Sequence, residues 1–172
     1  TSSGSIVATL YAVGYKPDEI YNIFKKYCKK IKYVDYKNIT KLFFGIILSG
    51  TITIDGLNSG NSIYKLINQV CNEKGVYNIS DINMPGEIIC FSSVIKRGFS
   101  DGLSFFYEAN IGKAVQASCS FPSVFSPCDF NHHKLLDGGI RENVPWRELK
   151  ILGADKVISA VFENDVNSNC CE

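Results

Sequence analysis

The sequence has almost no net charge. Among its 172 residues, 18 Lys and Arg are balanced by 17 Asp and Glu, so the formal net charge is +1. A protein that attracts nucleic acid or an anionic membrane through its overall field carries a marked excess of basic residues. We therefore expect no nucleic-acid partner.

The sequence also lacks a long hydrophobic run. The longest, residues 42–48, is far short of the about 18–20 residues that a membrane-spanning helix needs. This run would either belong to the core or line a pocket for an acyl chain. No signal peptide is visible, and the chain begins inside what reads as a strand–turn–helix unit. We therefore expect the natural N-terminus to lie upstream of Thr1.

The seven cysteines contain no C-x-x-C motif. Their odd number and scattered positions argue against a disulfide framework and against a zinc site. Cys28 and Cys90 fall within apolar or helical patterns, as expected of buried free thiols. Free thiols are typical of a reducing compartment, so we predict a cytoplasmic protein.

The sequence does have the composition of one globular domain, with 45% hydrophobic and 20% charged residues. Apolar periodicity predicts helices over residues 5–13, from Pro17 onward, and over 62–72, 111–118 and 145–152. Buried strands are predicted over residues 87–95, 134–136 and 156–162. This succession favours an α/β fold with three layers (α/β/α) and a mainly parallel central sheet.

The first five residues form a turn of small side chains, Thr1-Ser2-Ser3-Gly4-Ser5, that leads into a helix. With a preceding glycine it would read G-x-S-x-G, the nucleophile elbow that exposes a serine hydroxyl between a strand and a helix. The helix would direct its free N–H groups at a developing oxyanion. Two other interpretations remain open: a turn that caps a buried helix, and a phosphate-binding loop.

A second segment of interest is Asp137-Gly138-Gly139, which follows a predicted short strand. An Asp-Gly pair often forms a hairpin turn. A carboxylate at the end of a strand also lies where α/β proteins build their sites.

Together these segments resemble the patatin-like phospholipase family, and the likeness extends over nearly the whole chain. The matching segments are residues 1–5 (TSSGS) with the helix up to Gly14-Tyr15, Gly56-Leu57 with Gly60, residues 117–127 (ASCSFPSVFSP), residues 137–145 (DGGIRENVP) and residues 152–158 (LGADKVI). The order and spacing indicate the central and C-terminal part of one patatin-like domain, residues 1–172, without its first strand.

The resemblance implies a serine acyl hydrolase with a Ser-Asp dyad. Ser2 matches the nucleophile and Asp137 the base, with Gly4, Gly138 and Gly139 as supporting motif residues. The backbone N–H of Ser3 would supply one oxyanion donor. The family's other donors come from a glycine-rich loop upstream of the serine, and their loss would lower the rate roughly 100- to 1,000-fold.

The implied substrate is a fatty-acyl ester of the phospholipase A or lysophospholipase kind, approached through transient contact with a membrane surface. No metal and no cofactor are implied. The alternative is a catalytically impaired patatin-fold protein that binds or regulates. A phosphate binder is less favoured, because the turn lacks the lysine of a P-loop.

Other residues are weaker candidates. His132 or His133 could act as a base for Ser2, but both are expected in an exposed hairpin turn. Ser118 and Ser120 are alternative nucleophiles, but prolines follow them instead of a helix, so we expect them to shape a loop.

Overall fold

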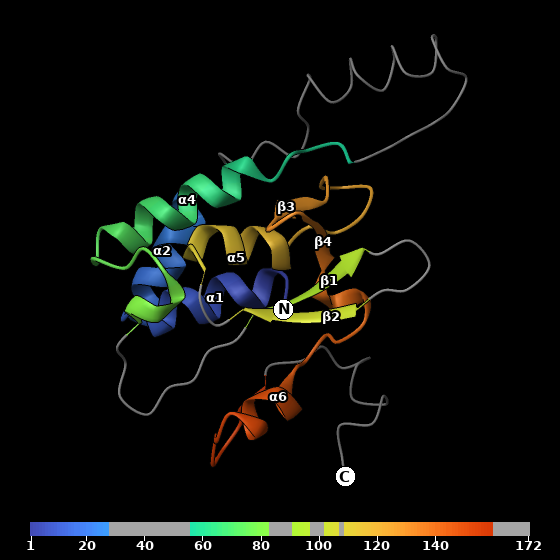
Figure 1. Cartoon of the computed structure of the whole chain (residues 1–172). Helices are drawn as coiled ribbons and strands as arrows, with labels where there is room; N and C mark the ends of the chain where they lie inside the picture. Colours follow the sequence, from blue (N-terminus) through green and yellow to red (C-terminus); the bar gives the residue numbers. More distant parts are fainter. Residues whose placement is uncertain (28–55, 83–90, 97–101, 107–108, 160–172) are drawn as a thin grey trace.

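The computed structural model describes residues 1–27, 56–82, 91–96, 102–106 and 109–159. In chain order, the elements are α1 (Ser3–Ala12), α2 (Pro17–Tyr27), α4 (Asn61–Asn72), the 3-10 turn η1 (Ile79–Asp81), β1 (Phe91–Lys96), β2 (Gly102–Phe106), α5 (Ile111–Ser118), β3 (Cys128–Phe130), β4 (His133–Asp137), the 3-10 turn η2 (Gly138–Ile140) and α6 (Trp146–Ile151) (Figure 1).

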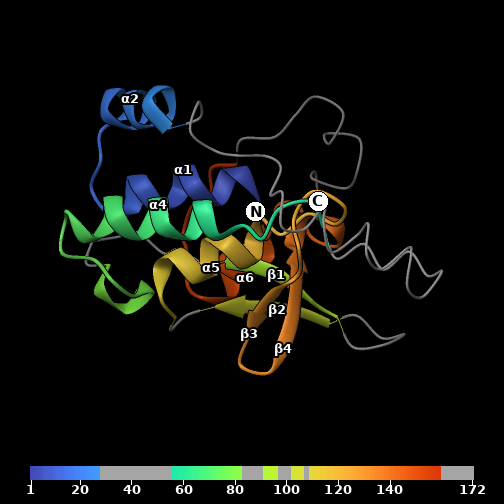
Figure 2. The ribbon, with the colours of Figure 1, turned by 90° about the horizontal axis from the view of Figure 1, so that it is seen from above.

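Helix α5 lies at the centre of this arrangement. It packs against α4 and α1 on one side and against β1, β3 and β4 on the other. Helix α2 packs on α1, on the side away from the sheet (Figure 2). Nearly every residue of α5 is buried, so this short helix joins the helical layer to the sheet.

The four described strands form one sheet in the order β2-β1-β4-β3. Each neighbouring pair is antiparallel. Short connections explain this direction for two of the three pairs: five residues join β1 to β2, and two join β3 to β4. Parallel neighbours need a crossover of a dozen or more residues. The described residues contain both helices and a sheet, as the predicted class requires, but the mainly parallel sheet is not found among the described strands.

The predicted buried strand over residues 156–162 is wrong over its described part. Residues 156–159 form no strand, and the side chain of Ile158 is 98% exposed. The apolar run predicted burial, but in the described residues no neighbouring strand pairs with it. Residues 160–162 lie outside the described part of the chain.

The predicted helices agree with the structure to within about two residues at most ends. Gly14 ends α1 with φ +97°, and the N–H of Tyr15 donates to the carbonyl of Leu10 at 3.0 Å. Asn110 caps α5 by accepting from the N–H of Lys113 at 3.0 Å. Local capping chemistry therefore fixes these boundaries.

The helix predicted over residues 5–13 is apolar on nearly every face, which predicts burial all round, but α1 is less buried than that. Leu10 is fully buried, but Val7 and Tyr11 are 46% and 47% exposed. The described neighbours, α5 and α2, contact α1 without surrounding it. The prediction of burial on nearly every face is therefore wrong for the described structure.

The main core lies between α4, α5 and the sheet. It contains Ile63, Ile67, Cys71, Val76, Ile79, Ile111, Ala114, Val115, Ala117, Cys119, Cys128 and Leu135. Cys71, Cys119 and Cys128 are buried free thiols, which confirms that prediction for these three. Cys28, Cys90 and residues 42–48 lie outside the described residues. Among the described helices, none has both the length and the apolar character to cross a bilayer.

Candidate active site

Ser2 has an uncommon backbone conformation. Its φ is 54° and its ψ is −132°, and α1 begins at the next residue. Residues with a side chain rarely adopt such values, which cost about 1–3 kcal/mol. A strained serine directly before a helix has the local geometry of a nucleophile elbow.

The Ser2 side chain does not cap α1. A serine at the N-cap position ordinarily accepts a hydrogen bond from the second or third helical N–H. Ser2 makes no such bond. The interpretation of this segment as a capping turn is therefore not supported. The hydroxyl of Ser2 makes no hydrogen bond to the first turn of α1.

Backbone contacts hold the Ser2 turn from both sides. The N–H of Ser2 donates to Oγ of Ser118 at 3.1 Å. The carbonyl of Ser2 accepts from the N–H of Ser5 at 2.9 Å and from Oγ of Ser5 at 2.5 Å. The strained conformation is thus fixed by partners from α5 and from α1 itself.

The first turn of α1 leaves one N–H group directed out of the helix. The N–H of Gly4 donates to the carbonyl of Thr1 at 3.1 Å. Ser3 is exposed, and no acceptor for its N–H is found within the described residues. Such N-terminal amides carry the positive end of the helix dipole, which suits an anion.

Asp137 ends β4 and is only 1% exposed. Its Oδ1 accepts from the N–H of Gly139 at 2.8 Å and so caps η2. Its Oδ2 is buried, with no hydrogen-bond partner among the described residues. The interpretation of Asp-Gly-Gly as a hairpin turn is wrong, because these residues open a 3-10 turn.

The Ser2 turn and the Asp137 loop lie together, although they come from opposite ends of the described chain. Oγ1 of Thr1 donates to the carbonyl of Glu142 at 3.1 Å. A Cβ added to Gly139 would lie 3.1 Å from Oδ1 of Asp137 and 3.8 Å from Cγ2 of Thr1. A side chain there would crowd both halves of the site.

The supporting glycines differ in their surroundings. Gly138 is buried, and Gly139 has little free space beside Asp137. A Cβ on Gly4 would meet nothing within 4 Å. Packing thus restricts Gly139 beside Asp137, whereas a side chain at Gly4 would meet open space.

The patatin-like phospholipase family model matches residues 1–150 of this sequence, which include both halves of the site. The chain belongs to this family. "Lysophospholipase NTE1" of Candida albicans is 28% identical over 159 residues, which cover 92% of this chain and 10% of that protein. The Saccharomyces cerevisiae protein of the same name is 28% identical over 168 residues, which cover 98% of this chain and 9% of that protein.

A viral relative is similar over a larger share of its own length. "Probable lipid hydrolase 463L" of Invertebrate iridescent virus 6 is 26% identical over 152 residues, which cover 84% of this chain and 49% of that protein. The chain spans about a tenth of the length of the fungal relatives.

In this patatin-like chain, Cys119 lies between the two halves of the site. Its Sγ is 3.7 Å from Oγ of Ser5. Burial raises the pKa of Cys119 to about 12, and the nearby charge of Asp137 contributes in the same direction. The thiol therefore stays protonated and is a poor nucleophile at neutral pH.

The histidines lie away from the family motifs. His132 and His133 are exposed in the β3–β4 hairpin, at the opposite end of β4 from Asp137. His133 and Asp137 are four residue steps apart along the strand, a separation of roughly 13 Å. Both histidines are exposed as expected, but only His132 lies in the turn, because His133 begins β4.

Neither alternative serine is positioned as a nucleophile. Ser118 is fully buried, and its Oγ accepts from Ser2. Ser120 is 1% exposed, and its Oγ donates to the carbonyl of Gln116 at 2.8 Å. The sequence missed the contact of Ser118 with Ser2, because it joins distant segments and has no local signal.

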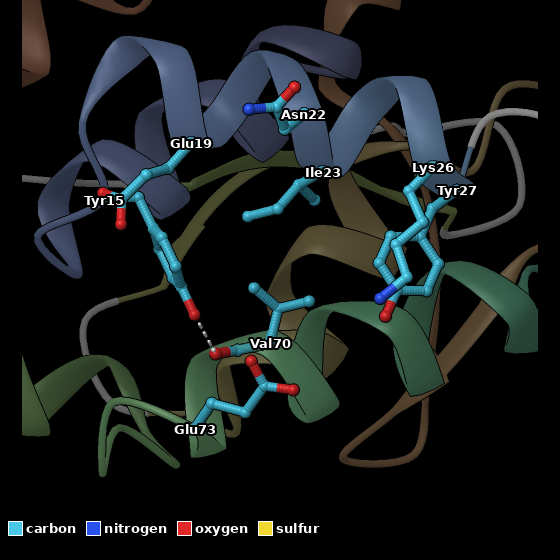
Figure 3. A pocket seen from close by; sticks show the side chains of 8 residues that line it. All are labelled: Tyr15, Glu19, Asn22, Ile23, Lys26, Tyr27, Val70 and Glu73. Atoms are coloured by element: carbon cyan, nitrogen blue, oxygen red, sulfur yellow. Dashed lines mark hydrogen bonds between the residues drawn. The ribbon is translucent and has the colours of Figure 1, made fainter.

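A hollow between α2 and α4 is separate from these residues (Figure 3). It has a volume of about 290 Å³ and is lined by Tyr15, Glu19, Asn22, Ile23, Lys26, Tyr27, Val70 and Glu73. The hydroxyl of Tyr15 donates across it to the carbonyl of Val70 at 2.8 Å. Since Tyr15 follows the C-terminal end of α1, this hollow lies at the other end of that helix from Ser2.

Within the described residues, no group of three or more His, Cys, Asp or Glu side chains could hold a metal ion.

Proposed function

We propose that this chain is the catalytic part of a serine acyl hydrolase, with Ser2 as nucleophile and Asp137 as base. One observation carries the proposal. A strained serine at the start of α1 lies beside the loop of a buried aspartate whose Oδ2 has no partner among the described residues.

The reaction would begin with Oγ of Ser2 attacking the carbonyl carbon of an ester. Oδ2 of Asp137 would take the hydroxyl proton, since a serine needs an adjacent base to become a nucleophile. The N–H of Ser3 would donate to the oxyanion of the tetrahedral intermediate. The C–O bond to the leaving alcohol would then break, the alcohol taking the proton from Asp137 and the acyl group remaining on Ser2.

Water would complete the cycle. A water molecule would attack the carbonyl carbon of the acyl-enzyme, and Asp137 would take a proton from that water molecule. Collapse of the second tetrahedral intermediate would release the fatty acid, and the proton would return to Ser2. One aspartate can serve both half-reactions, because the second reverses the proton transfers of the first.

We infer a fatty-acyl ester of a phospholipid or lysophospholipid as the substrate. The family is described as phospholipase-like, and relatives bear the names lysophospholipase and probable lipid hydrolase. Since such substrates reside in membranes or micelles, transient contact with a lipid surface belongs to the proposal. The proposal also includes a cytoplasmic location for the protein.

The role of Ser2 is tested by labelling the intact protein with a fluorophosphonate and mapping the modified peptide. The label should reside on Ser2, and Ser2→Ala should abolish both labelling and hydrolysis of lysophosphatidylcholine. Ser80→Ala is the matched control, because Ser80 is an exposed serine in η1. Labelling that survives in Ser2→Ala would refute the assignment.

The role of Asp137 is tested by Asp137→Asn, which keeps the shape but removes the base. The rate should fall on the order of 10³- to 10⁴-fold. Asp129→Asn is the control, because Asp129 is 78% exposed on β3 and pairs with Lys134 at 3.3 Å. Equal rates for Asp137→Asn and the wild type would exclude Asp137 as base.

A binding or regulatory role is the second candidate. The observation behind it is that, among the described residues, no hydrogen bond joins Asp137 to Ser2, so the contact that a Ser-Asp dyad requires is not formed. A wild-type protein that binds lysophosphatidylcholine micelles, but neither hydrolyses them nor reacts with the fluorophosphonate, would favour this role over catalysis.

A further inference from the structure

We propose that Ser118 is a positioning residue that holds the nucleophile turn in register with the base. This inference rests on the proposed function. Ser118 is the last residue of α5 and is fully buried. Its Oγ lies 3.1 Å from the N–H of Ser2, which donates to it.

The conformation of Ser2 explains why an outside partner is needed. Its φ of 54° directs the N–H away from the path that an ordinary helix start would give it. This N–H is part-buried, and an N–H shielded from water without an acceptor costs free energy. Oγ of Ser118 accepts from this N–H and thereby stabilises the positive-φ conformation of Ser2.

The two residues after Ser118 extend the connection to the base. Sγ of Cys119 contacts Oγ of Ser5, which in turn donates to the carbonyl of Ser2. The carbonyl of Ser120 accepts from the N–H of Asp137 at 3.0 Å. Three consecutive residues thus contact both the nucleophile turn and the end of β4.

Helix α5 is a rigid support for this arrangement. It is capped by Asn110 and packs against α1, α4, β1, β3 and β4. A Cβ on Gly112 would lie 2.7 Å from the carbonyl oxygen of Tyr64, which shows how closely α5 approaches α4. A shift of Ser2 relative to Asp137 therefore requires either breaking the Ser118 bond or moving the centre of the core.

Ser118→Ala tests the proposal in the intact protein by steady-state hydrolysis of lysophosphatidylcholine. It removes the acceptor for Ser2 without touching substrate, so kcat should fall about 100-fold while KM changes little. The matched control is Tyr15→Phe, which removes another buried hydroxyl that bonds a backbone group, at the far end of α1. Tyr15→Phe should lower Tm while kcat stays unchanged.

Amide hydrogen exchange at Ser2, followed by NMR, is a second measurement that needs no activity. The Ser2 N–H should exchange at least about tenfold faster in Ser118→Ala than in the wild type, whereas Tyr15→Phe should leave this ratio near one. Unchanged exchange in Ser118→Ala would overturn the inference by showing that the bond does not hold the turn.

The kinetic outcomes separate this inference from the proposed function. If Ser2→Ala is inactive but Ser118→Ala retains the wild-type kcat, the positioning role is wrong and the hydrolase assignment stands. A fall in kcat for Tyr15→Phe as large as that for Ser118→Ala would also overturn it, because general destabilisation would then explain both. If Ser2→Ala keeps full activity, the proposed function fails first.

Discussion

At the residue scale, Ser2 is held in a backbone conformation that costs free energy, and its side chain does not cap α1. The N–H and carbonyl groups of Ser2 are both bonded, to Ser118 and to Ser5 respectively. Such strain persists only where the surroundings over-determine the backbone. The sequence supplied the type of turn, but the partner that holds it lies in a distant segment.

Cys119 provides a prediction at the same scale. Burial raises the pKa of Cys119 to about 12, so the thiol stays protonated at pH 8. Iodoacetamide at pH 8 should leave Cys119 unmodified in the folded protein and modify it in urea, as peptide mapping by mass spectrometry would reveal. Rapid modification of the folded protein would contradict the burial of this thiol.

At the element scale, the described helices were more predictable than the sheet. Capping residues such as Asn110 and Gly14 act locally, so the described helices α1, α2, α4, α5 and α6 could be located from the sequence. Whether two strands are parallel or antiparallel depends on which segments pair in the sheet, and the local sequence does not indicate the pairing. The three-residue strand β3 was missed for the same reason, because only its pairing with β4 makes it a strand.

In the candidate site, too, features set by the local sequence could be predicted and contacts between distant segments could not. Ser2 and Asp137 were found from motifs, and the structure brings their segments together, while their catalytic roles stay predictions. The contribution of Ser118 could not be predicted. The position of Ser118 at the end of the predicted helix over residues 111–118 is correct, but nothing in the local sequence indicates that its hydroxyl contacts Ser2.

The contact between α4 and α5 gives a prediction for this scale. Gly112→Ala should lower the free energy of unfolding by about 1–3 kcal/mol, because the new Cβ would lie 2.7 Å from a backbone oxygen. Gly4→Ala is the matched control: it lies in α1 with nothing within 4 Å, and should raise stability by about 0.5–1 kcal/mol. Urea denaturation measures both, and equal effects would contradict the packing of α5.

At the scale of the whole molecule, stability should fall at alkaline pH through Tyr15, whose hydroxyl joins the end of α1 to α4. Burial, reinforced by the charge of Glu73, raises the pKa of Tyr15 above its ordinary value of 10.0. A raised folded-state pKa gives stability that is complete below the unfolded value and is lost as the pH rises through the folded value. This loss therefore begins above about pH 10.

Tyr15→Phe tests this dependence. Below pH 9 the variant should be less stable than the wild type by about 1 kcal/mol, because it lacks the hydroxyl bond to Val70. As the pH rises above 10 the difference should narrow, since ionised Tyr15 disfavours the folded state. Thermal denaturation of both proteins between pH 7 and 11 would measure it, and a constant difference would contradict the linkage.

The convergence of the Ser2 turn and the Asp137 loop on the end of α5 has a consequence for the order of folding. Contacts between residues far apart in the chain close large loops and are slow to form. Thr1 reaches Glu142, and Ser2 reaches Ser118, so the site assembles only when both ends of the described chain have docked on α5. During refolding, reactivity of Ser2 toward a fluorophosphonate should therefore return no earlier than the tertiary structure as a whole.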